Sequence, residues 1–198
     1  MSYDYEKFFE EKLKELAKED RVIDIGGGEP FQKGMAPYKR LFEGKKFETL
    51  EPAPELNPDI VGDIHNLPIK DNSIPAIICK SVLEHLEDPK KAVEELYRVL
   101  KPGGKALVYT HFIYPYHARK GAYGDYFRFT DEGLKYLFRD FSIVEVKKQG
   151  GYFRAMMFFV PFQARLKFVL GPMAYVFDKL LRTEKRSTTA GYYIYAVK

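Results

Sequence analysis

Two histidines that can act as general bases lie in one short segment of the sequence, HFIYPYHARKGAYGDYFRFT, residues 111–130. The ordinary pKa of a histidine lies near neutrality, so His117 or His111 can take a proton from a reacting hydroxyl group. A metal site built on this pair is less well supported, because no further histidine or cysteine ligand lies nearby in the sequence. We therefore expect a base at one of the two positions and no metal ion.

The same segment carries residues that could hold a substrate. Tyr114 and Tyr126 can stack on a ring or hydrogen-bond to it. Arg128 can hold an acidic group, and Asp125 can orient His117 or bind hydroxyl groups. The other interpretation is a packed loop whose rings fill the core and whose Asp125–Arg128 pair braces the chain. The segment has neither helical nor strand periodicity, so both interpretations describe a loop.

A sheet is expected to position this loop, because short apolar runs alternate with helical patterns through the first two-thirds of the chain. This alternation predicts an α/β fold with a doubly wound, mostly parallel sheet. Ligands of such sheets bind at the carboxyl ends of the strands. Residues 111–130 follow the fifth expected strand and should therefore lie at that edge, as a lid on the acceptor side. The expected strands are residues 21–25, 45–51, 60–63, 75–81, 105–110, 142–148 and 191–198.

Helices are expected between these strands. The N-terminal helix is placed within residues 1–20, with Asp4 as its cap. The clearest helical pattern is DPKKAVEELYRVLKPGG, with Asp88 as the cap, Pro89 at the first position and Gly103 as the stop. His85, shortly before it, is expected to make a hydrogen bond at the start of the helix.

Three glycines, Gly26 to Gly28, follow the first strand directly. Glycine is required where a turn is tight and a ligand approaches the backbone. The dinucleotide fingerprint would need a further glycine where Phe31 stands, and Pro30 removes one of the N–H groups that a pyrophosphate uses. The turn is therefore expected to bind a nucleoside that has no phosphate bridge.

Acidic residues end the next two strands, as a nucleoside site requires. Glu51, at the end of the second strand, can accept hydrogen bonds from both ribose hydroxyls. Asp63 ends the third strand, where it can hydrogen-bond an adenine that packs on Ile64. Each feature alone is weak, but their order at successive strand ends favours one shared binding site.

The motifs VIDIGGGEP, ETLEP, GDIHNLP, SVLEHLEDP and ELYRVLKPGGKALV resemble those of the class I S-adenosylmethionine-dependent methyltransferases, within the group that carries "LEH…RVLKPGG". The likeness covers about residues 22–110. It implies a Rossmann-like, seven-stranded sheet whose last strand is antiparallel, with S-adenosylmethionine as cofactor and S-adenosylhomocysteine as product. Residues 125–130 are more loosely similar to an element of methyltransferases associated with glycan biosynthesis.

The resemblance also assigns roles to matching residues. The methionine part of the cofactor falls to Asp24, Gly26 and Gly28, the ribose to Glu51, the adenine to Asp63 and Ile64, and the methyl-donor end to Lys80 and Ser81. Two positions depart from the family pattern. Pro30 stands where the family often has another glycine, which could reshape the methionine pocket. Pro75-Ala76 stands where an aspartate commonly begins the fourth strand, which concerns strand entry more than chemistry.

Length and composition favour a single domain over residues 1–198. The lone cysteine, Cys79, argues against a disulfide framework. The charged start, MSYDYEKFFEEK, does not resemble a signal peptide, so we expect a cytoplasmic protein. The net charge of +4 is divided unevenly, since the residues from Gly151 onward carry +6.

Residues 152–189 form an apolar and basic insertion before the last strand. Its two uncharged runs are each too short to span a bilayer. A helical stripe runs through the second half and includes Leu166, Val169, Leu170, Met173, Val176, Phe177, Leu180 and Leu181. The insertion could cap the active site, form a homodimer face, or place residues 152–186 on a membrane surface.

These observations favour methyl transfer to a small-molecule or glycan acceptor, including a lipid-linked one, most simply to a hydroxyl oxygen. Two alternatives stay open. A nucleic-acid methyltransferase would fit the basic C-terminal segment, but no N/D-P-P-Y/F motif follows the fourth strand, where CKSVLEH stands instead. The third interpretation is a nucleoside-binding scaffold without catalysis.

Overall fold

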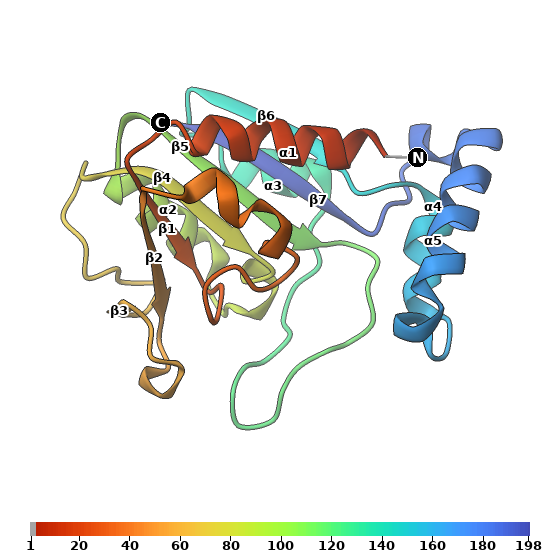
Figure 1. The fold of residues 1–198 in the computed structure, drawn as a ribbon, viewed down its shortest axis with the longest axis horizontal. Helices are drawn as coiled ribbons and strands as arrows, with labels where there is room; N and C mark the ends of the chain where they lie inside the picture. Colours follow the sequence, from red (N-terminus) through yellow and green to blue (C-terminus); the bar gives the residue numbers. More distant parts are fainter. Residues whose placement is uncertain (1–2) are drawn as a thin grey trace.

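The computed structural model describes residues 3–198 and contains one seven-stranded sheet in the order β3-β2-β1-β4-β5-β7-β6 (Figure 1). Strands β1 to β5 pair in parallel, and β7 pairs antiparallel with both β5 and β6. The predicted sheet with an antiparallel last strand is therefore confirmed. The strands are β1 Arg21–Ile25, β2 Lys46–Glu51, β3 Ile60–Val61, β4 Ile74–Lys80, β5 Leu100–His111, β6 Ile143–Lys148 and β7 Gly191–Val197.

Helices cover both faces of the sheet, because successive side chains of a buried strand point to opposite sides. In β4, Ile78 packs in the cluster with Phe9 and Leu13 of α1 (Asp4–Leu16), whereas Ile77 packs in the cluster with Leu96 of α2 (Pro89–Val99). The 3₁₀ helix η1 (Ala36–Phe42) lies on the α1 side, and α3 (Asp131–Leu137) lies on the α2 side. Figure 1 shows α1 in front of the sheet with α2 and α3 behind it.

The predicted N-cap residue is correct for α2 and wrong for α1. Asp88 caps α2 as expected, accepting the backbone N–H of Lys91 at 3.0 Å. The cap of α1 is Tyr3 and not Asp4, and its backbone N–H donates to the Glu6 carboxylate at 3.0 Å. Met1 and Ser2, the first residues of the expected N-terminal helix, lie outside the described part of the chain.

Two prolines shape the strands that carry the site. The expected stop of α2 at Gly103 was wrong, because the helix ends at Val99 and Leu100 already begins β5. Pro102 disfavours the helical conformation for the residue before it, so the chain leaves the helix early. In β4, the register with β5 shifts between Ile74 and Ala76, on either side of Pro75. The departure from the family pattern at Pro75 thus concerns strand entry.

Residues 152–185 form a helical hairpin, built from α4 Tyr152–Met156, η4 Met157–Phe159, α5 Gln163–Leu180 and η5 Thr183–Lys185. The fully buried carboxylate of Asp178 in α5 holds its base together. This carboxylate accepts the backbone N–H groups of Gly151, Phe153 and Arg154 at 2.9–3.1 Å and also the Tyr3 hydroxyl at 3.2 Å. A carboxylate at a helix start satisfies free N–H groups and favours the positive end of the helix dipole.

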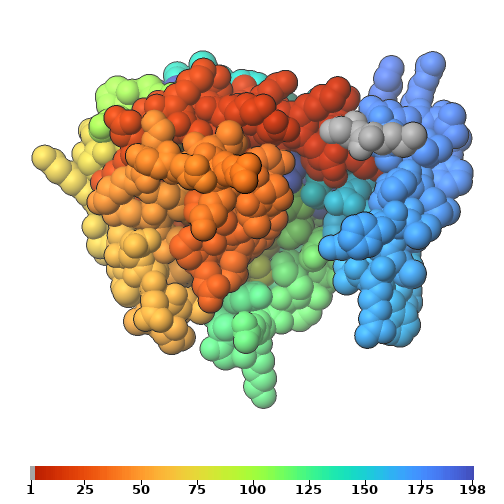
Figure 2. Space-filling view, viewed as in Figure 1, coloured from red at the N-terminus to blue at the C-terminus, as the bar shows by residue number. Residues whose placement is uncertain are grey.

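The apolar stripe of α5 faces outward, and only Ala174 and Asp178 of this helix are buried. The hairpin stands beside the sheet as a separate lobe (Figures 1 and 2). The exposed large apolar residues of the lobe are Tyr152, Phe159, Val160, Phe162, Leu166, Phe168, Val169, Met173, Val176, Phe177, Leu180 and Leu181. Within residues 3–198, no helix combines the length and the apolar character needed to cross a membrane.

Candidate active site

The glycine turn after β1 lies at the carboxyl edge of the sheet, where a side chain would not fit. Gly26 has a positive φ of 70°, and a Cβ there would overlap Val82. A Cβ on Gly27 would overlap the carboxylate of Asp24. The turn therefore needs glycine for its backbone geometry at Gly26 and for close packing over Asp24 at Gly27.

Asp24 lies beneath this turn, at the end of β1. Its side chain is only 2% exposed, and burial raises the pKa of its carboxyl to about 7, although the ammonium groups of Lys33 and Lys80 oppose that rise. Near neutral pH this carboxyl can therefore change protonation state when a cation arrives beside it.

Two further acidic residues follow in the expected order along the sheet edge. Glu51 ends β2, is 8% exposed, and its carboxylate accepts the backbone N–H of Gly28. The Asp63 side chain, just beyond β3, is exposed and accepts the backbone N–H of His65 at 2.9 Å. Ile64 is buried in the core below. Because β1, β2 and β3 are adjacent and parallel, their carboxylates line one edge.

Lys33 was not anticipated as a site residue, yet its side chain enters the centre of this edge. The Nζ atom donates to the backbone carbonyls of Gly26 at 2.6 Å, Lys80 at 2.9 Å and Ser81 at 3.2 Å. Ser81 has a positive φ of 53°. These three carbonyls form an acceptor set that suits an ammonium group, and Lys33 supplies one from the protein itself, close enough to Asp24 to oppose the rise of its pKa.

Lys80 lies on the α1 side of the same edge. Its Nζ atom donates to the Lys33 carbonyl at 2.8 Å and lies 4.5 Å from the centre of the Phe9 ring. Burial lowers the pKa of this amine to about 8. Beside it is a cavity of about 240 Å³, whose lining includes Tyr5, Phe9, Tyr38, Lys80, Gln149, Arg154 and Tyr193. Gln149 and Arg154 come from the last third of the chain, and sequence reasoning did not single them out.

Asp125 and Arg128 in the lid, residues 111–130, bind each other and hold the loop around His117. Arg128 donates two hydrogen bonds to the Asp125 carboxylate and further ones to the carbonyls of Pro115 and Phe127. The backbone N–H of His117 donates to Asp125 at 2.9 Å. The bracing role that the sequence left open is therefore present, since both residues contact the lid itself.

His111, at the end of β5, is buried behind Tyr114, whose ring stacks on it with a centroid distance of 3.8 Å. Nδ1 lies 3.1 Å from the Tyr109 hydroxyl, which donates to Gln149 at 2.7 Å. Nε2 lies 3.3 Å from the Glu84 carboxylate. Burial lowers the pKa of His111 to about 3, so its ring stays neutral at physiological pH and is a weak base.

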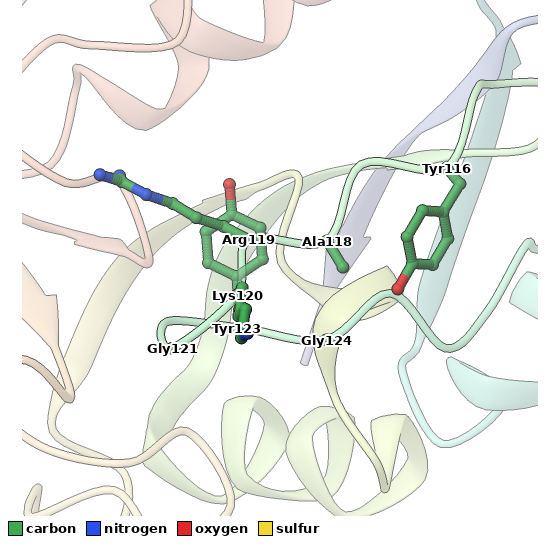
Figure 3. Close-up of a pocket in the computed structure, with 7 residues that line it drawn as sticks. All are labelled: Tyr116, Ala118, Arg119, Lys120, Gly121, Tyr123 and Gly124. Carbon is green, nitrogen blue, oxygen red and sulfur yellow. The ribbon is translucent and has the colours of Figure 1, made fainter.

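The tip of the lid surrounds an open hollow of about 530 Å³, lined by residues that include Tyr116, Arg119 and Tyr123 (Figure 3). Tyr126 does not join this hollow or the histidines. It is half exposed, and its hydroxyl donates to Glu87 at 2.9 Å. Of the four predicted substrate residues, Tyr114 alone contacts both histidines through its ring.

His85 contacts the lid and does not make the helix-start hydrogen bond expected of it. Its Nδ1 atom lies 2.6 Å from the Gly124 carbonyl, and its ring lies 4.7 Å from that of His117. Glu84, next to it in η3 (Leu83–His85), is fully buried. The motif LEH could have suggested both residues, but their partners lie about 30 residues further along the chain.

Parts of the sequence are similar to known methyltransferases. A family model described as "Methyltransferase domain" matches residues 43–108. The chain is 35% identical over 111 residues to an uncharacterised methyltransferase of Schizosaccharomyces pombe, covering 46% of this chain and 40% of that protein. It is 46% identical over 56 residues to a demethylmenaquinone methyltransferase of Paenarthrobacter aurescens, covering 28% of this chain and 22% of that protein. The chain thus spans less than half the length of these relatives.

Solved structures share the whole fold. A SAM-dependent methyltransferase from Archaeoglobus fulgidus has a TM-score of 0.63 at 15% identity, over 98% of this chain and 93% of that one. A phosphoethanolamine N-methyltransferase from Haemonchus contortus, solved with phosphomonomethylethanolamine and S-adenosylhomocysteine, has a TM-score of 0.61 at 16% identity, over 97% of this chain and 52% of that one. The matched sequence shows a methyltransferase domain over residues 43–108, and the solved structures show that the chain has the fold of S-adenosylmethionine-dependent methyltransferases.

Proposed function

We propose that the protein binds S-adenosylmethionine at the carboxyl edge of the sheet and transfers its methyl group to an acceptor. The observation that carries this proposal is the acceptor set formed by the carbonyls of Gly26, Lys80 and Ser81, which already binds the ammonium group of Lys33 within electrostatic reach of Asp24. The α-ammonium of the methionine part has the same chemistry. The residues present therefore fit the donor.

The remaining contacts follow the strand ends. Gly26 and Gly28 provide close backbone approach for the methionine part, Glu51 accepts the ribose hydroxyls, and Asp63 with Ile64 receives the adenine. When bound, S-adenosylmethionine supplies a methyl group on a sulfonium, which is already activated for displacement. The protein then contributes position, by holding acceptor and donor in line.

The acceptor would enter the cavity beside Lys80, between α1 and the residues Gln149 and Arg154. Lys80 and Arg154 line this cavity, and their charges favour a small molecule or glycan that carries an anionic group. We propose a hydroxyl oxygen as the methylated atom, because the lid brings together histidine and carboxylate groups that can assist its deprotonation. The low pKa of His111 makes it a poor base, so this role falls to His117 and its neighbours.

The helical hairpin is proposed to contact an anionic membrane surface, which would bring a lipid-linked acceptor to the enzyme. Phe162 and Phe168 are 75% and 80% exposed, and the exposed Arg165 and Lys167 lie between them in the sequence. Exposed rings beside cations are typical of segments that lie on anionic bilayers. The exposed stripe of α5 does not cover the site, whereas Arg154 of α4 lines the cavity; for the stripe, a homodimer face is the remaining alternative.

Isothermal titration with S-adenosylmethionine and S-adenosylhomocysteine tests the donor site. Glu51→Gln is expected to weaken binding by roughly tenfold or more, because it replaces the charged acceptor of the ribose hydroxyls. The control is Glu55→Gln, an exposed residue of η2 (Pro54–Leu56), which should bind like the parent protein. Absence of binding by either nucleoside would refute the proposal.

Incubation of labelled donor with a lysate of the source organism then tests transfer. Label in a small-molecule, glycan or lipid fraction supports the proposed acceptor class, and label in nucleic acid would replace it. Donor binding without transfer to any fraction would favour the nucleoside-binding scaffold.

A further inference from the structure

We infer that Glu84, His85 and His117 form a binding site for one divalent transition-metal ion. Each residue offers one ligand atom, and these atoms all lie within 4.8 Å of one another. Glu84 and His85 belong to η3, whereas His117 comes from the lid, so the site joins the two segments. The sequence argued against a metal because no third ligand lies near His117 in the chain, but the fold supplies two.

The hydrogen bonds of both imidazoles leave the nitrogen that a metal needs. Nδ1 of His85 lies 2.6 Å from the Gly124 carbonyl, an acceptor, so Nδ1 carries the proton and Nε2 carries the lone pair. Nδ1 of His117 lies 3.1 Å from the Pro115 carbonyl and 3.3 Å from the Asp125 carboxylate, which assigns the same tautomer. Metal-bound histidines almost always donate their other N–H to a carbonyl or carboxylate in this way.

Two buried atoms of the cluster have no hydrogen-bond partner, the Oε1 atom of Glu84 and the Nε2 atom of His117. The second carboxylate oxygen of Glu84 is satisfied, accepting the Thr110 hydroxyl at 2.8 Å. An unsatisfied buried polar atom is costly, by about 1–3 kcal/mol. A cation between Oε1 and Nε2 would remove both costs at once.

The neutral ring of His111 also fails to donate a hydrogen bond to the Glu84 carboxylate. The Tyr109 hydroxyl donates to Gln149, so it accepts from Nδ1 of His111 and leaves a lone pair on Nε2. That Nε2 lies 3.3 Å from Oε1 of Glu84. The Nε2 lone pairs of His111 and His117 and the Oε1 atom of Glu84 thus lie in one cluster, and none of these three atoms carries a hydrogen to donate. Either a metal ion or a proton on Glu84 is needed to offset the repulsion among them.

The ligand types identify the class of metal. Two imidazoles and one carboxylate suit Zn²⁺ or Fe²⁺, whereas Mg²⁺ and Ca²⁺ prefer sites built from oxygen. Three protein ligands leave a coordination position for water or a substrate oxygen, as in catalytic zinc sites. The bidentate Asp125–Arg128 pair fixes the segment that carries His117, which suits a supporting role around a metal.

The catalytic consequence rests on the proposed function, with one change: His117 as a metal ligand would not act as the base, and the metal would promote deprotonation instead. An acceptor hydroxyl bound at the open position would lose its proton to water more readily, because the metal stabilises the alkoxide. The alkoxide oxygen would then form a bond to the methyl carbon while the methyl–sulfur bond breaks, and its electron pair stays on sulfur to give the thioether.

Zn²⁺ titration of the full chain after chelation and dialysis tests the site without any need for turnover. One equivalent of bound Zn²⁺ is expected, both by calorimetry and by elemental analysis. Glu84→Gln and His117→Gln should each weaken binding by about a hundredfold or more, since each removes a ligand and outer-sphere changes alone cost about 10–100-fold. Two variants on different segments are used, with thermal melting to show that each folds.

The matched control is His65→Gln, because His65 lies beside Asp63 and is the histidine that contacts none of the three proposed ligands. It should bind Zn²⁺ like the parent protein. Loss of binding in this control, or unchanged binding in both cluster variants, would overturn the site. Absence of Zn²⁺ binding in the parent would also overturn it and leave a protonated Glu84. Donor titration of the same samples keeps this result separate from the proposed function.

Discussion

Arg128 donates to both oxygens of the Asp125 carboxylate, from Nη1 at 2.5 Å and from Nη2 at 2.7 Å. The Asp125 side chain has no exposed surface, whereas Arg128 keeps about a quarter of its own. Hydrogen bonds from the guanidinium lower the pKa of Asp125 strongly, so the carboxylate stays ionised at any physiological pH. The lid is therefore built around the buried negative charge of Asp125, which the Arg128 guanidinium stabilises.

Removing that partner should open the lid. Arg128→Ala leaves a buried carboxylate without its guanidinium, and charge-assisted hydrogen bonds contribute about 1.5–3 kcal/mol. We expect trypsin to cut at the exposed Arg119 and Lys120 at least about tenfold faster, because cleavage follows the population of the open lid. Turnover should fall while donor binding is unchanged, as measured by titration.

The control for lid opening is Arg139→Ala. Arg139 is exposed, and its guanidinium donates a hydrogen bond to the nearby Tyr136 carbonyl, outside the lid. Its cleavage pattern should match that of the parent protein. Equal cleavage of Arg128→Ala and the parent would show that the ion pair does not hold the lid.

Lys33 should compete with the donor, since its ammonium occupies the three carbonyls that the donor's α-ammonium would use. Lys33→Met keeps the length of the side chain and removes the charge. We expect S-adenosylmethionine to bind up to about tenfold more tightly, because the competing hydrogen bonds no longer have to break. Lys39→Met, an exposed position in η1, is the control. Weaker binding in Lys33→Met would instead show that the ammonium contacts the donor's carboxylate.

Donor binding should depend on pH through Asp24, whose pKa is raised to about 7 by burial. Below pH 7 this carboxyl is largely neutral and must release a proton before it can pair with the donor's ammonium. The dissociation constant should therefore fall by up to about tenfold per pH unit on approach to pH 7 and level off above it. Calorimetry between about pH 5.5 and 7.5 measures this dependence, and Asp24→Asn should abolish it.

The free protein should show the opposite trend in stability. The unfolded carboxyl of Asp24 ionises near its ordinary pKa of 3.8, while the folded one holds its proton up to about pH 7. Asp24 thus stabilises the fold fully below about pH 4, and this contribution is lost as the pH rises to about 7. The difference in melting temperature between the parent and Asp24→Asn should shift along this interval. A difference in melting temperature that stays constant between about pH 4 and pH 7 would show that the pKa of Asp24 lies outside this interval.

The hairpin should bring the protein to anionic vesicles. Phe162→Ser and Phe168→Ser remove exposed rings, and inserting such a ring into lipid contributes about 1.5–3 kcal/mol, so each change should weaken partition by roughly tenfold or more. Flotation with phosphatidylglycerol vesicles measures binding, and Tyr136→Ser, exposed on α3, is the control. If the parent protein does not bind vesicles and instead dimerises through these rings, the hairpin is a homodimer face and not a membrane contact.

The sequence predicted which of the proposed donor-site residues lie at one edge of the sheet, because a parallel sheet fixes where each strand ends. Asp24, Glu51 and Ser81 follow strands that run in the same direction, so their gathering at one edge depends only on strand order. Lys33 could not be anticipated in the same way. Its position depends on a loop with positive φ at Phe31 and Lys33, which the sequence does not specify.

The acceptor side was less predictable, because its contacts join distant segments. The cluster of Glu84, His85 and His117 requires the lid to fold back on η3, and the Glu84 carbonyl accepts lid N–H groups from Tyr126 and Phe127. The apolar stripe of α5 was equally ambiguous. A helical stripe normally indicates a buried face, and here most of the stripe is exposed.

Asp178 has a consequence for how this protein could vary or be engineered. This carboxylate binds Tyr3 and Gly151 outside the hairpin and joins the two ends of the hairpin through Phe153, Arg154 and Thr183, so all of its contacts lie at the base. The distal residues 159–173 include no buried side chain, so they form an exchangeable module, whereas Phe158 packs against Tyr114 of the lid. Their sequence can be replaced or shortened to redirect the enzyme to another surface while the catalytic domain keeps its fold.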